Sequence, residues 1–147
     1  MSLKKTMVLA LSVSLVIGVV LTGGCARDET APPETLTQII EDITPQEAFA
    51  LIQNNQSNPD FAIIDVRTPE EFAGEHIENA ININFYSKSF QDTLKILDKN
   101  KTYLIYCAVG GRSGSALDIM AELNFREAYN ILGGVNQWKA EGLPITK

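Results

Sequence analysis

Cys107 is the side chain of this sequence that is best placed for nucleophilic chemistry. It opens a segment that lies between an apolar run and a stretch with helical spacing, Cys107-Ala108-Val109-Gly110-Gly111-Arg112-Ser113. A cysteine between a strand and a helix lies at the helix N-terminus, where backbone N–H groups and the helix dipole favour an anion. Arg112 adds a cation that keeps its proton at any working pH. These features favour the thiolate of Cys107, which is the nucleophilic form.

Gly110 and Gly111 allow this segment to curl into a cradle that residues with a Cβ atom would resist. A ring of donors around a nucleophile holds an anion that is bonded to it. The alternative is a buried structural cysteine at a strand end, because free cysteine is among the most buried residue types. The Gly-Gly-Arg-Ser sequence after Val109 favours the functional interpretation, and we expect Cys107 to be ionised and accessible.

Three residues near the expected site are interpreted mainly as structural. Asp65 and Arg67 follow another apolar run and could bind substrate. We expect them instead to form an ion pair that fixes the adjoining loops, because breaking one partner of such a pair is costly. His76 could act as a general base for Cys107. We expect a turn histidine that hydrogen-bonds to the backbone, since the cradle makes a base unnecessary.

Two helix starts share one sequence pattern. Thr44-Pro45-Gln46-Glu47 and Thr68-Pro69-Glu70-Glu71 each place Thr at the N-cap, Pro at the first helical position and Glu at the third. This combination predicts a capping box, with the proline where no backbone N–H is needed. We expect a helix from each, the second a short one that ends near Gly74.

Short apolar runs with the length of strands alternate with helical patterns in the rest of the chain. The runs are residues 61–64, 80–83, 103–106 and 128–132, and the helical patterns are residues 89–97, 113–123 and 135–141. Ile63-Ile64 and Leu104-Ile105 lack polar alternation, which indicates strands buried on both faces. The sequence therefore predicts an α/β fold with an open, mostly parallel central sheet of about five strands and helices on both faces. Ligands of such sheets bind beyond the carboxyl ends of the strands, where Cys107 and the Gly133-Gly134 turn would lie.

Composition excludes several classes of protein. The chain has 147 residues, of which 45% are hydrophobic and 20% charged, as expected for one globular domain. A net charge of −6 argues against a nucleic-acid partner, which needs a basic face. Two cysteines and one histidine cannot form the usual four-ligand zinc site.

The N-terminal segment resembles the signal peptide of a bacterial lipoprotein. Lys4 and Lys5 precede an uncharged apolar run over residues 7–21, and Thr22-Gly23-Gly24-Cys25 follows, with Thr22 where such signals usually have an aliphatic residue. We expect residues 1–24 to be a signal peptide, Cys25 to be lipidated, residues 25–41 to be a flexible tether and residues 42–147 to be the domain. A simple secretory signal or an uncleaved anchor are the alternatives. The resemblance implies a lipid anchor to a membrane of the cell envelope on its extracytoplasmic side, in the periplasm or at the cell surface.

The domain resembles the rhodanese-type sulfurtransferases. Their active-site loop runs from Cys to Arg with four residues between, as does the segment from Cys107 to Arg112. The stretches 64–72, 74–77 and 80–83 resemble the first signature of the family. Glu75 separates Gly74 from His76 and Asn79 replaces a usual Gly, so we expect this turn to differ slightly from that of the family. The closing signature is matched by Gly133-Gly134, Trp138 and Gly142-Leu143-Pro144.

The resemblance implies a sulfur-transfer reaction. Cys107 would take the outer sulfur of thiosulfate or of a small-molecule or protein persulfide, and would pass it to a thiol or cyanide acceptor. The backbone N–H groups of the loop would bind the persulfide, and Arg112 would orient or charge-balance the substrate. The substrate-binding residues are then Ala108, Val109, Gly110, Gly111 and Ser113, and no metal or organic cofactor is required.

Two features of the loop refine this expectation. The related cell-cycle phosphatases and arsenate reductases have five residues between Cys and Arg, so the four found here favour sulfur chemistry. Ala108 and Val109 are apolar and Arg112 is the one cation of the loop, which predicts weak activity with dianionic thiosulfate and a preference for a persulfide. A non-catalytic binding module of the same fold is the alternative, and the presence of Cys107 argues for the enzyme.

Overall fold

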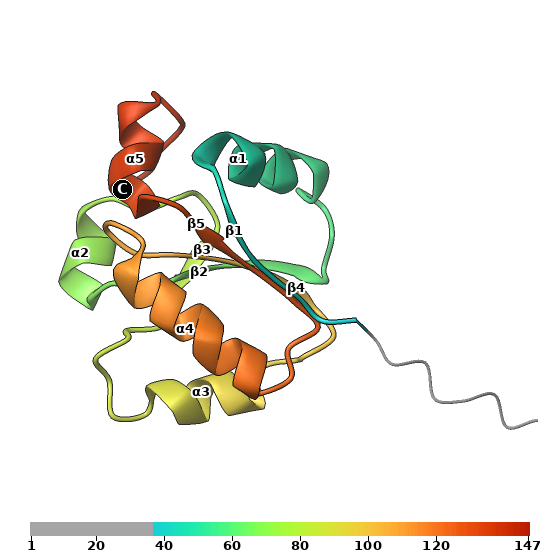
Figure 1. Cartoon of the computed structure of the whole chain (residues 1–147). Helices are drawn as coiled ribbons and strands as arrows, with labels where there is room; N and C mark the ends of the chain where they lie inside the picture. The colour runs from blue at the N-terminus through green and yellow to red at the C-terminus, as the bar shows by residue number, and fades with distance from the viewer. Residues whose placement is uncertain (1–36) are drawn as a thin grey trace, which may run out of the picture. The chain divides into compact units, whose positions relative to one another are not determined.

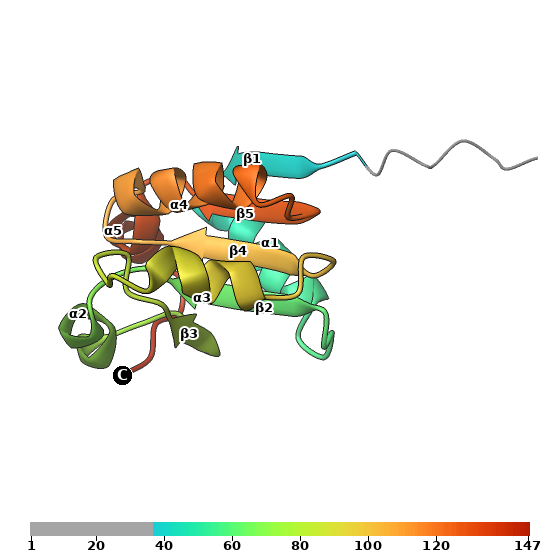
Figure 2. The ribbon, with the colours of Figure 1, turned by 90° about the horizontal axis from the view of Figure 1, so that it is seen from below.

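The computed structural model describes residues 37–147, which contain one five-stranded sheet. The strands are β1 (Ile39–Ile43), β2 (Phe61–Asp65), β3 (Ala80–Asn82), β4 (Thr102–Tyr106) and β5 (Glu127–Ile131). All neighbours are parallel, in the order β1-β5-β4-β2-β3 (Figures 1 and 2). This confirms the predicted α/β fold with a parallel sheet. The predicted signal peptide and Cys25 lie outside the described residues.

Five helices accompany these strands: α1 (Pro45–Asn54), α2 (Pro69–Gly74), α3 (Phe90–Ile96), α4 (Gly111–Glu122) and α5 (Gly134–Ala140). Both predicted capping boxes are present, at Thr44 with Glu47 and at Thr68 with Glu71. As predicted, α2 ends at Gly74. Within residues 37–147, no helix has both the length and the apolar character needed to cross a membrane.

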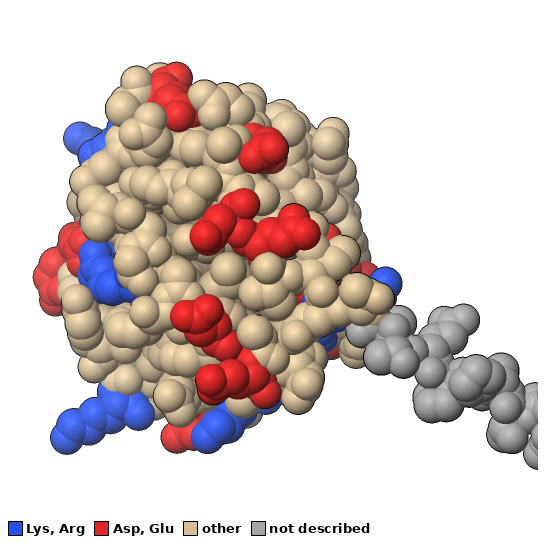
Figure 3. Space-filling view, viewed as in Figure 1, with Lys and Arg blue, Asp and Glu red and all other residues tan. Residues whose placement is uncertain are grey.

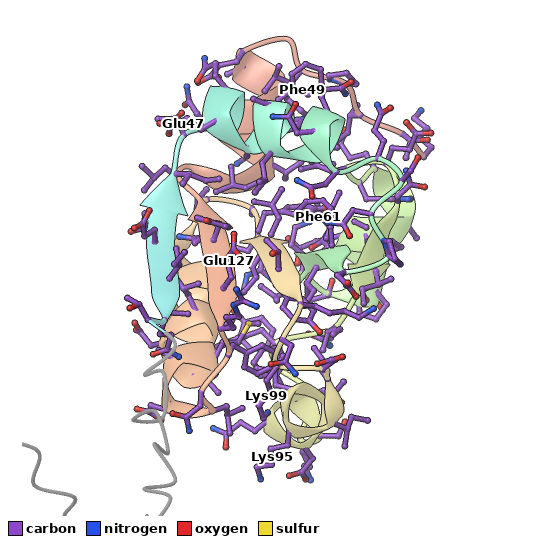
Figure 4. All side chains as sticks on the ribbon, turned by 90° about the vertical axis from the view of Figure 1, so that its right-hand side faces the viewer. Glu47, Phe49, Phe61, Lys95, Lys99 and Glu127 are labelled. Carbon is purple, nitrogen blue, oxygen red and sulfur yellow. The ribbon has the colours of Figure 1, made fainter. Side chains whose placement is uncertain are left out.

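The sheet is buried between two hydrophobic cores. Ile64 and Ile105 pack under α3 and α4, whereas Ile63 and Leu104 face the opposite core, under α1 and α5. Figure 4 shows α1 with Phe49 and α3 with Lys95 on opposite sides of the sheet. Successive residues of a strand point to opposite faces of the sheet, and both faces are buried here. Successive residues must therefore both be apolar, which explains why these runs do not alternate with polar residues.

Strand β1 begins inside the segment predicted as a tether. Its first residue, Ile39, lies three residues before the predicted domain start at Asp42, so the domain is longer than expected. β1 is an edge strand that pairs with β5 alone, and Ile39, Glu41 and Asp42 are exposed. Without a second neighbouring strand it needs no continuous apolar run, and it therefore lacks the signal that marks the other strands. Figure 3 shows acidic side chains on the face that carries α4 and β1.

The turn before β3 contains Asn79 at the position where the family signature usually has Gly. Asn79 has a φ of +64°, in the left-handed region. Asn tolerates this conformation better than most residues with a Cβ atom, because its short polar side chain can hydrogen-bond locally. Asn79 can therefore take this conformation, and β3 begins directly after it at Ala80.

Candidate active site

Cys107 lies between the carboxyl end of β4 and the first residue of α4, Gly111. The predicted loop is thus located at the edge of the sheet where all five parallel strands end. The side chain is held from within the loop, because the backbone N–H of Gly110 donates to Sγ at 3.1 Å. Gly110 has a φ of +96°, which only glycine adopts readily, and this conformation turns the loop back toward the sulfur.

Gly111 contributes differently from the prediction. It is the first residue of α4, its φ is not positive, and a Cβ atom there would meet no heavy atom within 4 Å. The curl of the loop therefore depends on Gly110 and not on both glycines. Space and backbone conformation would accept alanine at position 111, although the sequence alone does not distinguish the two positions.

Ser113 is the buried polar side chain of this loop. It is fully buried, and its hydroxyl lies 3.2 Å from the carbonyl oxygen of Gly110. The single hydroxyl proton is donated to that carbonyl or to the ionised sulfur of Cys107, which also receives the backbone N–H groups of Ser113 and Val109. Three of the predicted substrate-binding positions, Val109, Gly110 and Ser113, are thus the residues that surround the sulfur.

These donors decide the ionisation of Cys107. Burial raises the pKa of the thiol and is the largest single effect, but the hydrogen bonds from the Ser113 hydroxyl and from the backbone N–H groups of Ser113, Val109 and Gly110 together outweigh it. The pKa of Cys107 is therefore lowered from its ordinary value. The loop backbone and Ser113 produce this effect, and the guanidinium of Arg112 is not among its main causes.

Arg112 is paired with the carboxylate of Glu71, which the sequence pattern predicts only as part of a helix cap. Its Nη1 and Nη2 donate to Oε2 and Oε1 of Glu71, each at 2.8 Å. Its guanidinium carbon also lies 5.6 Å from the centre of the Tyr86 ring. Glu71 can reach Arg112 because the first turns of α2 and α4 lie at the same edge of the sheet, after the adjacent strands β2 and β4. The adjacency of β2 and β4 is the signal by which Glu71 could be recognised as the partner of Arg112.

The sulfur is covered in this structure, contrary to the expectation of an accessible thiol. Cys107 exposes 1% of its surface, while Val109 beside it exposes 66% and Tyr86 exposes 68%. The curled loop that donates hydrogen bonds to Sγ also lies over it. A cavity of about 560 Å³ opens between α1, β2 and Trp138, but no residue of the loop lines it. The access of a donor to Sγ therefore depends on the groups that cover the sulfur in this structure.

The Gly133-Gly134 turn supports the loop from outside. The backbone N–H groups of Val135 and Asn136 donate to the carbonyl oxygens of Cys107 and Ala108, at 2.8 and 3.1 Å. Gly134 makes this approach possible, because a Cβ atom there would lie 2.4 Å from the Cys107 carbonyl oxygen. The turn therefore positions the Cys107 backbone and leaves the sulfur to the loop itself.

Asp65 and Arg67 form a buried ion pair. Arg67 Nη2 lies 2.7 Å from Asp65 Oδ2, and the two residues expose 4% and 0% of their surfaces. The same Nη2 donates to the carbonyl oxygen of Glu75, and Asn82 Nδ2 donates to the carbonyl oxygens of Asp65 and Arg67. The pair thus ties the end of β2 to the α2–β3 connection, which agrees with a supporting role.

His76 is occupied by structural contacts. Its Nδ1 lies 3.0 Å from the carbonyl oxygen of Phe72, and its ring stacks on Phe72 with 4.0 Å between ring centres. Its backbone pairs with Thr146 near the C-terminus. Within residues 37–147 there is also no cluster of three metal-ligating side chains.

Comparison with known proteins identifies the relatives of this domain. The family model described as "Rhodanese-like domain" matches residues 34–141. The thiosulfate sulfurtransferase GlpE of Coxiella burnetii is 34% identical over 94 residues, which cover 64% of this chain and 82% of that protein. The thiosulfate sulfurtransferase PspE of Escherichia coli is 37% identical over 70 residues, which cover 48% of this chain and 67% of that protein. A crystal structure of a rhodanese-like domain protein from Staphylococcus aureus is 33% identical with a TM-score of 0.57, covering 73% of this chain and 99% of that one.

Proposed function

This chain belongs to the rhodanese-like domain family, and we propose that it is a sulfurtransferase whose Cys107 carries sulfane sulfur as a persulfide. The observation that supports this proposal best is the ring of donors around Sγ, in which the N–H of Gly110 lies 3.1 Å from the sulfur. Donors that stabilise a thiolate also stabilise a persulfide anion on the same residue. The names of the GlpE and PspE relatives support the same class of reaction.

In the first half-reaction the Cys107 thiolate attacks the outer sulfur of the donor. With thiosulfate, a bond forms between Sγ and the sulfane sulfur, the donor S–S bond breaks, and its electron pair leaves with sulfite. With a protonated persulfide RSSH, the same attack yields the Cys107 persulfide and releases the thiolate RS⁻. The lowered pKa of Cys107 increases the fraction of the nucleophilic thiolate.

In the second half-reaction the acceptor attacks the outer sulfur of the Cys107 persulfide. Cyanide leaves as thiocyanate, and a thiolate acceptor leaves as a persulfide. Cys107 returns to the thiolate, so neither half-reaction needs an external oxidant or reductant. The donors around Sγ, which are the backbone N–H groups of the loop and the Ser113 hydroxyl, stabilise the leaving thiolate.

A persulfide is the proposed preferred donor. Arg112 has no free charge to offer a dianion, because both of its terminal nitrogens bind Glu71. We expect the steady-state efficiency with glutathione persulfide to exceed that with thiosulfate. Comparable efficiencies for the two donors would contradict this preference.

Mass spectrometry provides the direct test of the persulfide. After incubation with a donor and removal of excess, the wild-type protein should gain about 32 Da, the mass of one sulfur atom, and should form thiocyanate from cyanide. Cys107→Ser should do neither, whereas Cys25→Ser, which alters the other cysteine, should keep both properties. Equal behaviour of wild type and Cys107→Ser would remove the catalytic assignment.

The burial of Cys107 favours a second candidate function, a non-catalytic binding module that uses the loop to hold an anion or a peptide. If the protein is such a module, its Cys107→Ser variant should bind the ligand as well as the wild type does. It would also leave the thiol unreacted in the presence of a donor, so the mass measurement separates the two candidates.

We also propose a lipid anchor at Cys25 on the extracytoplasmic side of a membrane. The support is the sequence of residues 1–25 alone. Expression with a labelled fatty acid should label the wild-type chain in the membrane fraction, and Cys25→Ala should abolish the label. An unlabelled wild-type chain that retains residues 1–24 would contradict this proposal.

A further inference from the structure

The charge of the Cys107 loop is compensated inside the site. Arg112 and Glu71 share two hydrogen bonds of 2.8 Å in a bidentate ion pair. Their side chains expose only 18% and 35% of their surfaces, so water screens the pair incompletely. Both terminal nitrogens of the guanidinium are therefore directed at a carboxylate and not at a substrate.

Other contacts fix the ion pair in place. Glu71 Oε2 also accepts the backbone N–H of Thr68 at 3.0 Å, and the Glu71 N–H donates to the Thr68 hydroxyl at 3.3 Å. The guanidinium of Arg112 lies over the Tyr86 ring. Hydrogen bonds from Arg112 are the main cause that lowers the pKa of Glu71 to about 2, so the carboxylate is ionised wherever the thiolate exists.

The pair determines which charge a donor meets. With Cys107 ionised, the three groups sum to one negative charge, and Arg112 offers no unpaired attraction to offset it. A donor with two negative charges is repelled more strongly than a donor with one. Resting on the sulfurtransferase function proposed above, we propose that Glu71 is a positioning residue that makes the site select singly charged sulfur donors over doubly charged ones.

Two small donors isolate charge from the chemistry of transfer. Thiosulfate is a dianion that releases sulfite, and methanethiosulfonate is a monoanion that releases methanesulfinate. In both, the Cys107 thiolate forms a bond to the outer sulfur while the bond from that sulfur to the oxidised sulfur breaks, with the electron pair leaving on the latter. The ratio of their kcat/KM values therefore reports mainly the charge that the site accepts.

Glu71→Gln is the test variant, and Glu70→Gln is its matched control. Gln at position 71 can still accept the Thr68 N–H and keep the helix cap, but it releases the charge of Arg112. Glu70 belongs to the same helix, is exposed, and forms no ion pair within the described residues. Both variants remove one negative charge from the protein.

We expect Glu71→Gln to raise kcat/KM for thiosulfate about tenfold, mainly through KM, and to change that for methanethiosulfonate less than threefold. Glu70→Gln should change both values less than twofold. An unchanged donor ratio in Glu71→Gln, or an equal change in the two variants, overturns the proposal. If Glu71→Gln unfolds, Glu71→Asp, which keeps the charge but is too short for both bonds, should give a smaller gain in the same direction.

A titration without turnover separates failure of this inference from failure of the proposed function. The freed guanidinium should lower the pKa of Cys107 in Glu71→Gln relative to Glu70→Gln, as followed by the ultraviolet absorbance of the thiolate. A wild-type protein that uses no donor refutes the sulfurtransferase function. An unshifted titration refutes the role of Glu71, whatever the activity.

Discussion

Replacing Gly134 by alanine tests whether the turn before α5 positions the Cys107 loop. A Cβ atom at this position would lie 2.4 Å from the Cys107 carbonyl oxygen, 2.7 Å from the Ala108 carbonyl carbon and 2.8 Å from its oxygen. These are backbone atoms, so no side chain can rotate away and the loop itself must move. Gly134 also has a φ of +57°, which disfavours any residue with a Cβ atom.

Gly142→Ala separates the two contributions. Gly142 has a φ of +71°, but a Cβ atom there would meet nothing within 4 Å. Both variants lose about 1–2 kcal/mol because of the left-handed conformation. Gly134→Ala alone adds the overlap, which costs about 1–3 kcal/mol in forced backbone shifts. We therefore expect free energies of unfolding lower by about 2–5 kcal/mol in Gly134→Ala and by about 1–2 kcal/mol in Gly142→Ala.

Urea denaturation and a thiolate titration form the assay. In Gly134→Ala the displaced loop carbonyls lose the bonds from Val135 and Asn136, the donors around Sγ shift, and the pKa of Cys107 should rise toward its ordinary value. In Gly142→Ala that pKa should not change. Equal destabilisation of the two variants, or an unchanged titration in Gly134→Ala, would refute the argument that the turn supports the loop.

Three further outcomes follow from the site. Ser113→Ala should slow alkylation of Cys107 at neutral pH several-fold, because the thiolate loses a charge-assisted hydrogen bond; an unchanged rate would show that the backbone donors suffice. Asp65→Ala should lower the free energy of unfolding by about 3–5 kcal/mol by leaving a buried guanidinium unpaired, whereas Asp60→Ala at the surface should change it by less than about 0.5 kcal/mol. The pKa of Glu71 is lowered to about 2 from its usual 4.5, so the ionised carboxylate stabilises the folded protein fully above pH 4.5. This stabilisation is lost as the pH falls to 2, and the acid denaturation of Glu71→Gln should lack this component.

Local patterns predicted the elements they specify directly. A capping box lies within four consecutive residues, so the starts of α1 and α2 were predictable. Strands buried on both faces carry continuous apolar runs, and these marked β2 and β4. Strand β1 lacks such a run, because it has one neighbouring strand and an exposed edge, so its first residues fall within the predicted tether.

The site was predictable in its centre and not in its surroundings. Cys107 and the donors of its loop lie within seven consecutive residues, where glycines and a helix start indicate the backbone. The partner of Arg112 lies 41 residues away, and only the adjacency of β2 and β4 brings Glu71 to it. The burial of Cys107 likewise depends on how the loop packs, which residue types do not reveal.

The exposed edge of β1 bears on how copies of this domain meet one another. An unpaired strand edge is a template for pairing with a second chain, and long apolar edges promote aggregation. Glu41 and Asp42 place carboxylates on this short edge, and β5 occupies the other side of the strand. Two copies that approach edge to edge would bring like charges together, so the carboxylates disfavour open-ended pairing of β-strands between copies.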